Sequence, residues 1–349
     1  MRAVVMRRGQ LVVDEIADPS PGPAQVLVRT LACGICGSDL HALDHAEEMV
    51  EMALEASDAT PGGMPAPRVM DPARDVVMGH EFCGEVVELG ESTANCAVGD
   101  IVVSIPVTFD ATGLHAIGYS NRYPGGYGEL MVLSDPLALK VPNGLDPRSA
   151  ALTEPFAVGL HAVNRSNAGA RTAALVLGCG PVGLATIAAL ALRGVEPIVA
   201  ADLSPRRREL AATMGAHATV DPQVDEPIEV WRGLDGRKPL VLFEAVGAPG
   251  LLDTAMRAAP RGSQIVVVGV CMQPDTVRPM RAVVKELEIR FAFGYDPVEF
   301  ADTLRSIAEG EIDVAPLITG QVSLEQVPGA FHDLAHPDGH AKILVEPAR

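Results

Sequence analysis

The sequence lacks an apolar run long enough to cross a bilayer, and it lacks an excess of positive charge. Its 349 residues include 27 Lys and Arg against 45 Asp and Glu, a formal net charge of −18. Such a chain repels anionic nucleic acids and phospholipid surfaces. No stretch approaches the roughly 20 apolar residues of a membrane-spanning helix, and the opening MRAVVMRRGQLVVDE becomes charged too early for a signal peptide. We therefore expect a cytoplasmic protein with neither a nucleic acid nor a membrane as partner.

Cysteine is too sparse for a disulfide framework, because only six thiols are spread over the whole chain. The pair Cys33 and Cys36, in CGICGSDLH, has the C-x-x-C spacing of a metal or redox site. Neither a second C-x-x-C nor a histidine pair completes a structural zinc site. The surrounding sequence is rich in strands, unlike the small α/β unit of a redox dithiol. Metal binding, catalysis and core packing stay open for these thiols.

The chain contains two regions with different sequence patterns. It has no internal repeat or low-complexity tract. The first 150 residues are rich in Val, Gly and Pro, with alternating segments at 25–29 and 84–88 that predict short strands. From about Ala173, apolar strands, glycine turns and Ala/Leu-rich helices follow one another. That alternation predicts an α/β fold with a doubly wound parallel sheet. A helix at 297–309 and a strand near 341–345 are expected to close the chain.

A glycine-rich turn, GCGPVG at 178–183, follows one apolar run and opens a helical one. Gly178 permits the tight turn, Gly180 lets a pyrophosphate approach the backbone, and Gly183 lets helix pack on strand. Asp202 ends the next apolar run, where its carboxylate can bind an adenosine ribose and repel a 2′-phosphate. The turn therefore predicts dinucleotide binding and favours NAD. The arginines at 206–208 leave NADP open, since they form either a phosphate site or a solvated face.

A second set of residues has the chemistry of a metal site. GHEFCGE at 79–85 contains a histidine and carboxylates beside glycines, and Glu154 precedes Pro155 further along. A thiolate, an imidazole and a carboxylate make an open tetrahedral zinc site with a vacant position for substrate.

The ordered motifs GICGSDLH, GHEFCGEV and VLGCGPVG, followed by Asp202, resemble those of the zinc-dependent alcohol dehydrogenases of the medium-chain dehydrogenase/reductase family. The resemblance runs through essentially the whole chain. It implies a GroES-like β-rich catalytic domain at 1–150 and 297–349, and a Rossmann NAD-binding domain at 151–296. It also implies a small-molecule alcohol or carbonyl substrate, and a homodimer or homotetramer.

The resemblance assigns roles at the zinc. It makes Cys36 and His80 ligands, and Asp39 the residue that orients the histidine. Cys33 is expected to be a small buried side chain that does not bind the metal. Glu154 resembles the glutamate of the polyol and threonine dehydrogenase branches, so it is the expected third ligand, with Glu81 as an alternate.

The chain departs from many relatives because it offers only Cys96 where they carry four cysteines for a structural zinc. We therefore expect one catalytic zinc per chain. Gly37 stands where some relatives place a basic residue on the cofactor pyrophosphate, and Lys342 is the candidate to replace it.

The family mechanism implies that zinc stabilises an alkoxide, while Ser38 takes the hydroxyl proton and passes it by way of the nicotinamide ribose to His41. The alternative for His41 is a surface histidine. By the same resemblance, the cofactor contacts are as follows: Gly178, Gly180, Pro181, Val182, Gly183, Asp202, Arg207, Val246, Val268 and Val270.

Two rival functions share the fold. A zinc-free quinone or enoyl reductase usually lacks both metal motifs and prefers NADPH. A non-catalytic NAD-binding relative would tolerate loss of the ligands, whereas Cys36, His80 and Glu154 are all present. The expected reaction is hydride transfer between a primary or secondary alcohol and NAD. Phe109 and Phe156 suggest an apolar substrate, although no anchor for a particular head group is evident.

The stretch between His41 and His80 is longer than in the relatives it resembles. Its apolar residues recur at helical spacing opposite an acidic face, which predicts an amphipathic helix over about 42–56, ended by the glycine-rich turn at 60–63. One hypothesis is a lid that presents Met49, Met52 or Met64 to the substrate. An elaboration or a subunit contact away from the pocket is the alternative.

Overall fold

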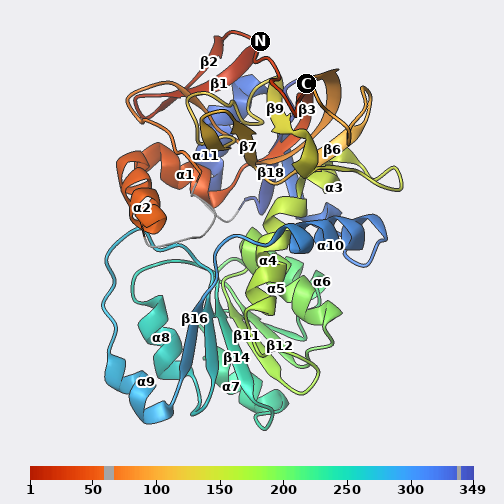
Figure 1. The fold of residues 1–349 in the computed structure, drawn as a ribbon. Helices are drawn as coiled ribbons and strands as arrows, with labels where there is room; N and C mark the ends of the chain where they lie inside the picture. The colour runs from red at the N-terminus through yellow and green to blue at the C-terminus, as the bar shows by residue number, and fades with distance from the viewer. Residues whose placement is uncertain (59–66, 336–338) are drawn as a thin grey trace. The chain divides into compact units, whose positions relative to one another are not determined.

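The computed structural model of the protein describes residues 1–58, 67–335 and 339–349. Figure 1 shows the ribbon, in which the chain forms two compact units. Unit 1 consists of Met1–Glu154, Ile318–His336 and Lys342–Arg349, and unit 2 consists of Pro155–Leu317 and Pro337–Ala341. Residues 297–317 were expected in the catalytic domain, but their contacts group them with unit 2.

Unit 1 is built on mostly antiparallel strands. Its main sheet has the order β10-β6-β5-β3-β18-β17, with β9 also paired to β3. The strands of this sheet are β3 (Gln25–Gly34), β5 (Glu81–Leu89), β6 (Ile101–Ser104), β9 (Leu130–Ser134), β10 (Ala138–Lys140), β17 (Ile318–Val322) and β18 (Lys342–Val345). The expected strands at 25–29, 84–88 and 341–345 are therefore confirmed, and the first two are longer than predicted.

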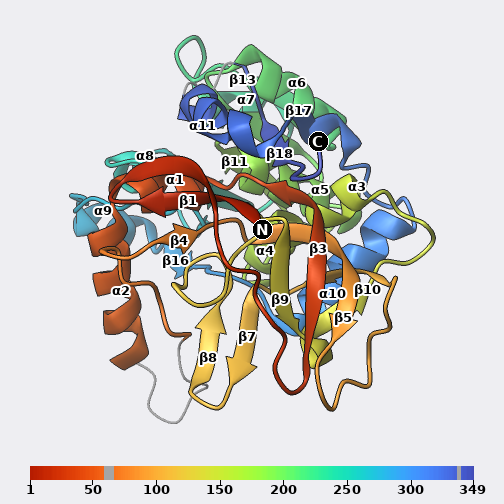
Figure 2. The same ribbon diagram turned by 90° about the horizontal axis from the view of Figure 1, so that it is seen from above.

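Two smaller sheets complete unit 1. The three-stranded sheet β2-β1-β4 comprises β1 (Arg2–Arg7), β2 (Gln10–Glu15) and β4 (Val76–Val77). The hairpin of β7 (Val107–Asp110) and β8 (Gly113–Ala116) is visible as a pair of yellow arrows in Figure 2. The helical segments of this unit are α1 (Gly37–Asp44), α2 (Ala46–Asp58), η1 (Asp135–Leu137), α3 (Pro147–Ala151), η3 (Leu324–Gln326) and α11 (Val327–Ala335). Helix α4 (Thr153–Asn164) begins in unit 1 and continues in unit 2.

The long connection after β3 forms two helices where the sequence predicted one. Helix α1 already begins at Gly37, because the Asp39 side chain accepts the Cys36 N–H and caps its first turn. Helix α1 ends at Asp44 with His45 as its C-cap, and α2 follows from Ala46. On α2, Ala46, Met49 and Val50 pack against the core of unit 1. The expected stop at 60–63 and Met64 lie outside the described residues.

Unit 2 contains a six-stranded parallel sheet in the order β13-β12-β11-β14-β15-β16. Its strands are β11 (Ala173–Leu177), β12 (Ile198–Ala201), β13 (Ala218–Val220), β14 (Leu240–Glu244), β15 (Gln264–Val267) and β16 (Glu288–Phe291). The order reverses between β11 and β14, so the predicted doubly wound Rossmann topology is confirmed. Ligands of such sheets bind beyond the carboxyl ends of the strands at this reversal.

Helices connect the parallel strands. They are α5 (Pro181–Leu192), α6 (Pro205–Thr213), α7 (Pro227–Leu234), α8 (Leu251–Ala258), α9 (Pro279–Lys285) and α10 (Pro297–Ala308), with a 3-10 turn, η2, at Ala315–Leu317. A proline opens each of the six α-helices except α8, since its fixed φ suits the first turn and its missing N–H is not needed there. Residues 183–190 of α5 are all buried. Among the described residues, no helix combines the length and apolar character that crossing a bilayer requires.

Candidate active site

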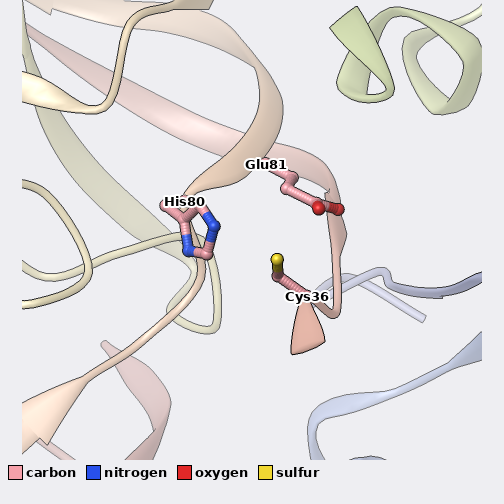
Figure 3. Close-up of side chains that lie close together, drawn as sticks. All are labelled: Cys36, His80 and Glu81. Atoms are coloured by element: carbon pink, nitrogen blue, oxygen red, sulfur yellow. The ribbon is translucent and has the colours of Figure 1, made fainter. Parts of the chain in front are cut away.

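Three side chains of unit 1 form a cluster of potential metal ligands. One donor atom each from Cys36, His80 and Glu81 lies within 4.8 Å of the others. Figure 3 shows the three side chains directed toward a common space. The cause is the antiparallel pairing of β3 with β5, which sets Gly34 opposite Glu81 and so brings the end of one strand beside the start of the other. Thiolate, imidazole and carboxylate are the donors that zinc prefers, so this set fits the metal.

Glu81 is held by a buried ion pair. Its carboxylate oxygens lie 2.8 and 2.7 Å from Lys342 Nζ, which also donates to the Ile35 carbonyl at 3.0 Å. Both side chains are enclosed, with 1% of Lys342 and 0% of Glu81 exposed. Burial lowers the pKa of Lys342, but the charge of Glu81 outweighs it and the net pKa is raised. Lys342 is therefore a buried cation paired with Glu81, and its suggested role on the cofactor pyrophosphate stays a prediction.

Gly34 makes room for this ion pair. A Cβ on Gly34 would lie 2.0 Å from Glu81 Oε2 and 3.1 Å from Glu81 Cδ. Any side chain there would displace the carboxylate from Lys342. The glycine after Cys33 is thus required by Glu81, which the sequence motif alone did not reveal.

Asp39 lies at the centre of the hydrogen bonds behind the cluster. Its oxygens accept Tyr119 Oη at 2.8 Å, Tyr127 Oη at 2.7 Å and the Cys36 N–H at 2.9 Å. His80 Nδ1 lies 3.4 Å from Asp39 Oδ1, a long contact, and has no closer partner among the described residues. Burial raises the pKa of Asp39, but His80 and the hydrogen bonds outweigh it and lower the pKa. A fully buried carboxylate facing the histidine ring is the placement expected of a residue that orients it.

The two cysteines of the C-x-x-C pair differ in environment. Cys33 is fully buried, and burial raises the pKa of its thiol well above the usual range. Its sulfur fills space beside Gly79 and Gly126, which agrees with a packing role. Cys36 is half-buried at the N-cap of α1.

Ser38 and His41 lie on α1, one turn apart on the same face. Ser38 Oγ lies 3.0 Å from Tyr119 Oη. Partial burial lowers the pKa of His41, and the neighbouring His45 lowers it further. His41 is therefore neutral near pH 7 and able to accept a proton.

Glu154 lies in the first turn of α4 and is the last residue of the first segment of unit 1. It is not one of the three residues whose donor atoms cluster within 4.8 Å, although its charge helps to raise the pKa of Lys342. Phe109, suggested as a pocket residue, lies on β7 with 45% of its surface exposed. Phe156 is buried in α4.

The three glycines of the glycine-rich turn in unit 2 differ in whether the fold leaves room for a side chain. Two of them have no room for a Cβ, and one does. Gly178 has φ +95°, and a Cβ on it would lie 2.5 Å from Val246 Cγ2. A Cβ on Gly183 would lie 2.0 Å from the Gly178 oxygen. A Cβ on Gly180, the N-cap of α5, would meet nothing within 4 Å. Open space at the middle glycine is the feature that a pyrophosphate approaching the backbone needs, so the turn fits a dinucleotide. Pro181 and Val182 follow as the first two residues of α5.

The other expected cofactor residues lie near the carboxyl ends of the strands. Asp202 follows β12 and accepts the N–H groups of Cys179 at 2.7 Å and Ser204 at 2.9 Å, which ties it to the glycine turn. Arg207 lies in the first turn of α6, and its Nε is buried without a hydrogen bond among the described residues.

The valines expected beside the nicotinamide lie on the loops after β14 and β15. Val246 and Val270 are half-exposed, and Val268 is buried. Glu244 Oε1 holds the first loop by accepting the N–H of Val246 and Gly247 at 2.8 and 2.9 Å.

A second group of potential ligands, His161, Asp296 and Glu299, lies in unit 2. The Glu299 carboxylate accepts His161 Nδ1 at 2.7 Å, Asn164 Nδ2 at 2.6 Å and the Asp296 N–H at 2.8 Å. Asp296 and Glu299 form the capping box of α10. These bonds account for the group as a helix cap.

Tyr119 and Tyr127 were not predicted from the sequence as site residues. The available signal was GYSNRYPGGYG at 118–128, which contains four glycines. A Cβ on Gly118 would lie 2.9 Å from the Gly79 oxygen, and one on Gly125 would lie 2.3 Å from it. These glycines let the loop approach the backbone directly before His80, and so bring both tyrosines to Asp39.

Comparisons with known proteins identify the family of the chain. A family model described as "Alcohol dehydrogenase GroES-like domain" matches residues 22–143, and one described as "Zinc-binding dehydrogenase" matches residues 181–309. The (R,R)-butanediol dehydrogenase of Bacillus subtilis (strain 168) is 33% identical over 96% of each chain. The sorbitol dehydrogenase of Gallus gallus is 28% identical over 99% of this chain and 96% of its own.

Solved structures show the same similarity. The crystal structure of 2R,3R-butanediol dehydrogenase from Bacillus subtilis superposes with a TM-score of 0.82 at 31% identity, covering 99% of each chain. A putative zinc-binding dehydrogenase from Sinorhizobium meliloti 1021, bound to NADP, gives a TM-score of 0.82 at 29% identity, also covering 99% of each chain. The zinc-free reductase and the non-catalytic relative are not favoured by these matches. The chain belongs to the zinc-type medium-chain dehydrogenase family and is an alcohol oxidoreductase.

Proposed function

We propose that this chain oxidises a secondary alcohol carrying a neighbouring hydroxyl group to the corresponding ketone, with NAD as hydride acceptor and one zinc ion per chain. The observation that carries the proposal is the cluster of Cys36, His80 and Glu81 backed by the buried carboxylate of Asp39. The comparisons support it, because similar chains are named butanediol and sorbitol dehydrogenases, and both named compounds have hydroxyls on adjacent carbons.

Cys36 and His80 are the proposed zinc ligands, with Glu154 as the third. Glu81 is already neutralised by Lys342, so it is the reserve carboxylate in this assignment. Bound zinc supplies a Lewis acid that makes the alcohol hydroxyl more acidic.

The chain's own residues then handle the proton. Ser38 is the proposed acceptor of the alcohol proton, and it releases its own proton toward His41, one turn away on α1. His41 is suited to this role because its lowered pKa keeps it neutral near pH 7. Asp39 holds the His80 ring, and Lys342 keeps the charge of Glu81 compensated.

The NAD preference rests on Asp202. Its carboxylate is fixed beside the glycine turn by the N–H of Cys179, where a 2′-phosphate on the ribose would meet negative charge. The similar NADP-bound structure makes cofactor choice a matter for experiment.

The surroundings of Ser38 favour a polar substrate over the apolar one suggested by the sequence. The nearest side chains to Ser38 Oγ include the Tyr119 hydroxyl at 3.0 Å. A second substrate hydroxyl can form hydrogen bonds with such groups, whereas an apolar chain would leave them unsatisfied.

We also propose a homo-oligomer, because the edge strand β16 and the residues after it expose Phe291 (66%) and Phe293 (89%). Sedimentation velocity tests this, and a monomer at micromolar concentration would contradict it.

The proposed activity is tested with purified protein, zinc, and either NAD or NADP. We expect kcat/KM to be higher for vicinal diols and polyols than for simple primary alcohols, and higher with NAD than with NADP. Substrate oxidation that persists after complete zinc removal, or a preference for simple primary alcohols, would contradict the proposal.

A further inference from the structure

One side chain, Tyr119, touches three residues of the proposed active site. Its hydroxyl lies 3.0 Å from Ser38 Oγ and 2.8 Å from Asp39 Oδ1. Its ring lies 5.2 Å from the His80 ring, centroid to centroid, at an interplanar angle of 38°. Tyr119 therefore connects the proposed proton acceptor, the proposed zinc ligand and the carboxylate that faces this ligand.

Hydrogen-bond geometry gives this connection a direction. A phenol has a single proton, and a carboxylate can only accept. The Tyr119 hydroxyl is the donor in both contacts, and the charged Asp39 is the stronger of its two acceptors. Ser38 Oγ is the second acceptor of the same hydroxyl, at 3.0 Å, so the Ser38 hydroxyl proton stays available for release toward His41.

We propose that Tyr119 is a positioning residue that fixes Ser38 and the Asp39–His80 pair relative to one another. The inference rests on the proposed function, because it gives Ser38 a part in alcohol oxidation. Without the Tyr119 hydroxyl, Ser38 loses the bond that orients it, and Asp39 loses one of the donors that hold its carboxylate toward His80.

Tyr127 provides a matched control within the same network. Its hydroxyl donates to Asp39 Oδ2 at 2.7 Å and also lies 3.4 Å from the Gly34 carbonyl. Both tyrosines therefore hold Asp39, but the contact with Ser38 belongs to Tyr119. Phenylalanine at either position removes the hydroxyl and keeps the ring.

The first measurement is independent of catalysis. Zinc release from the purified holoenzyme to a chromophoric chelator is followed for the wild type, Tyr119→Phe and Tyr127→Phe, together with the visible absorption of the cobalt-substituted forms. Groups that orient metal ligands typically change metal affinity by about 10- to 100-fold. We expect each variant to release zinc about 10-fold faster than the wild type, with a shifted cobalt spectrum. Release from Tyr119→Phe at the wild-type rate would overturn the inference.

The second measurement separates Tyr119 from Tyr127. We expect Tyr119→Phe to lower kcat by about 10- to 100-fold with little change in KM, because a misplaced proton acceptor costs part of the 10²- to 10⁴-fold that such a group supplies. Tyr127→Phe should lower kcat by clearly less than Tyr119→Phe does at saturating zinc, because it leaves the contact with Ser38 in place. In the Ser38→Ala background, Tyr119→Phe should lower kcat by no more than about 2-fold further, since the two residues act as a unit.

Two outcomes of the second measurement overturn the inference: equal kcat losses in the two phenylalanine variants, or a full loss from Tyr119→Phe in the Ser38→Ala background. Failure of the proposed function is distinguishable, because it is seen as absence of alcohol oxidation by the zinc-loaded wild type. The zinc-release rates then still decide whether Tyr119 supports the metal site.

Discussion

Replacing Lys342 with methionine should destabilise unit 1 far more than removal of an exposed lysine or arginine would. The change keeps the length and apolar stem of the side chain but leaves Glu81 as a buried, unpaired carboxylate, since both of its oxygens are bound by Lys342 Nζ at 2.7 and 2.8 Å. Breaking a buried ion pair by removing one partner costs about 3–5 kcal/mol in free energy of unfolding. We expect Lys342→Met to fall within that range.

Arg29→Met is the matched control. Arg29 pairs with Glu85 at 2.8 Å in the same sheet, but 52% of its side chain and 32% of that of Glu85 are exposed. Exposed pairs contribute about 0–1 kcal/mol, so Arg29→Met should cost no more than about 1 kcal/mol. The charge-balanced double variant Glu81→Gln/Lys342→Met should recover most of the loss, because it buries no unpaired charge.

The assay is urea denaturation of chelator-treated protein followed by circular dichroism. Hydrogen exchange of peptides covering β3 and β18 then assigns the loss to unit 1. A cost for Lys342→Met no greater than that for Arg29→Met would refute the reasoning. So would a double variant as unstable as the single one, because buried charge would then not be the cause.

Three further predictions follow from the contacts described above. Asp110 accepts hydrogen bonds from Thr112, His115 and Tyr123. Burial alone would raise the pKa of Asp110, but these hydrogen bonds have the larger effect and the net pKa is lowered. Asp110→Asn should therefore cost about 2–3 kcal/mol near pH 7. The difference from wild type should shrink as the pH falls below about 3.9, where the unfolded carboxyl becomes protonated; a pH-independent difference in urea titrations would count against this assignment. Asp202→Ser should raise kcat/KM for NADP relative to NAD by at least about 10-fold by removing charge repulsion, and an unchanged ratio would show that Asp202 does not select the cofactor. Glu154→Gln should lower zinc affinity more than the charge-balanced Glu81→Gln/Lys342→Met pair does, and the reverse order in chelator competition would make Glu81 the ligand.

Local sequence patterns predicted the parts of the fold that depend on neighbouring residues. The alternation of apolar strands and helices after Ala173 predicted the parallel sheet, and the glycine spacing at 178–183 predicted the turn before α5, because both features arise within short segments. The expected helix over 42–56 was only partly right. Periodicity does not show the interruption at His45, or the earlier start that Asp39 makes possible by capping Cys36.

Contacts between distant segments could not be predicted in the same way. Lys342 stands 261 residues from Glu81 and reads as an ordinary lysine at the start of a strand, yet the pairing of β18 with β3 places it in the core. Tyr119 and Tyr127 reach Asp39 only because Gly118 and Gly125 pack against Gly79. Both features depend on the tertiary fold.

The central claim is that Cys36 and His80 hold a single zinc ion, and zinc content tests it most directly. Elemental analysis of the purified protein should give about one zinc per chain in the wild type, because the described residues contain one thiolate-bearing cluster of ligands. In Cys36→Ser the content should fall toward zero, since a neutral hydroxyl replaces a thiolate. Full zinc occupancy in Cys36→Ser, or two zinc ions per wild-type chain, would contradict the account.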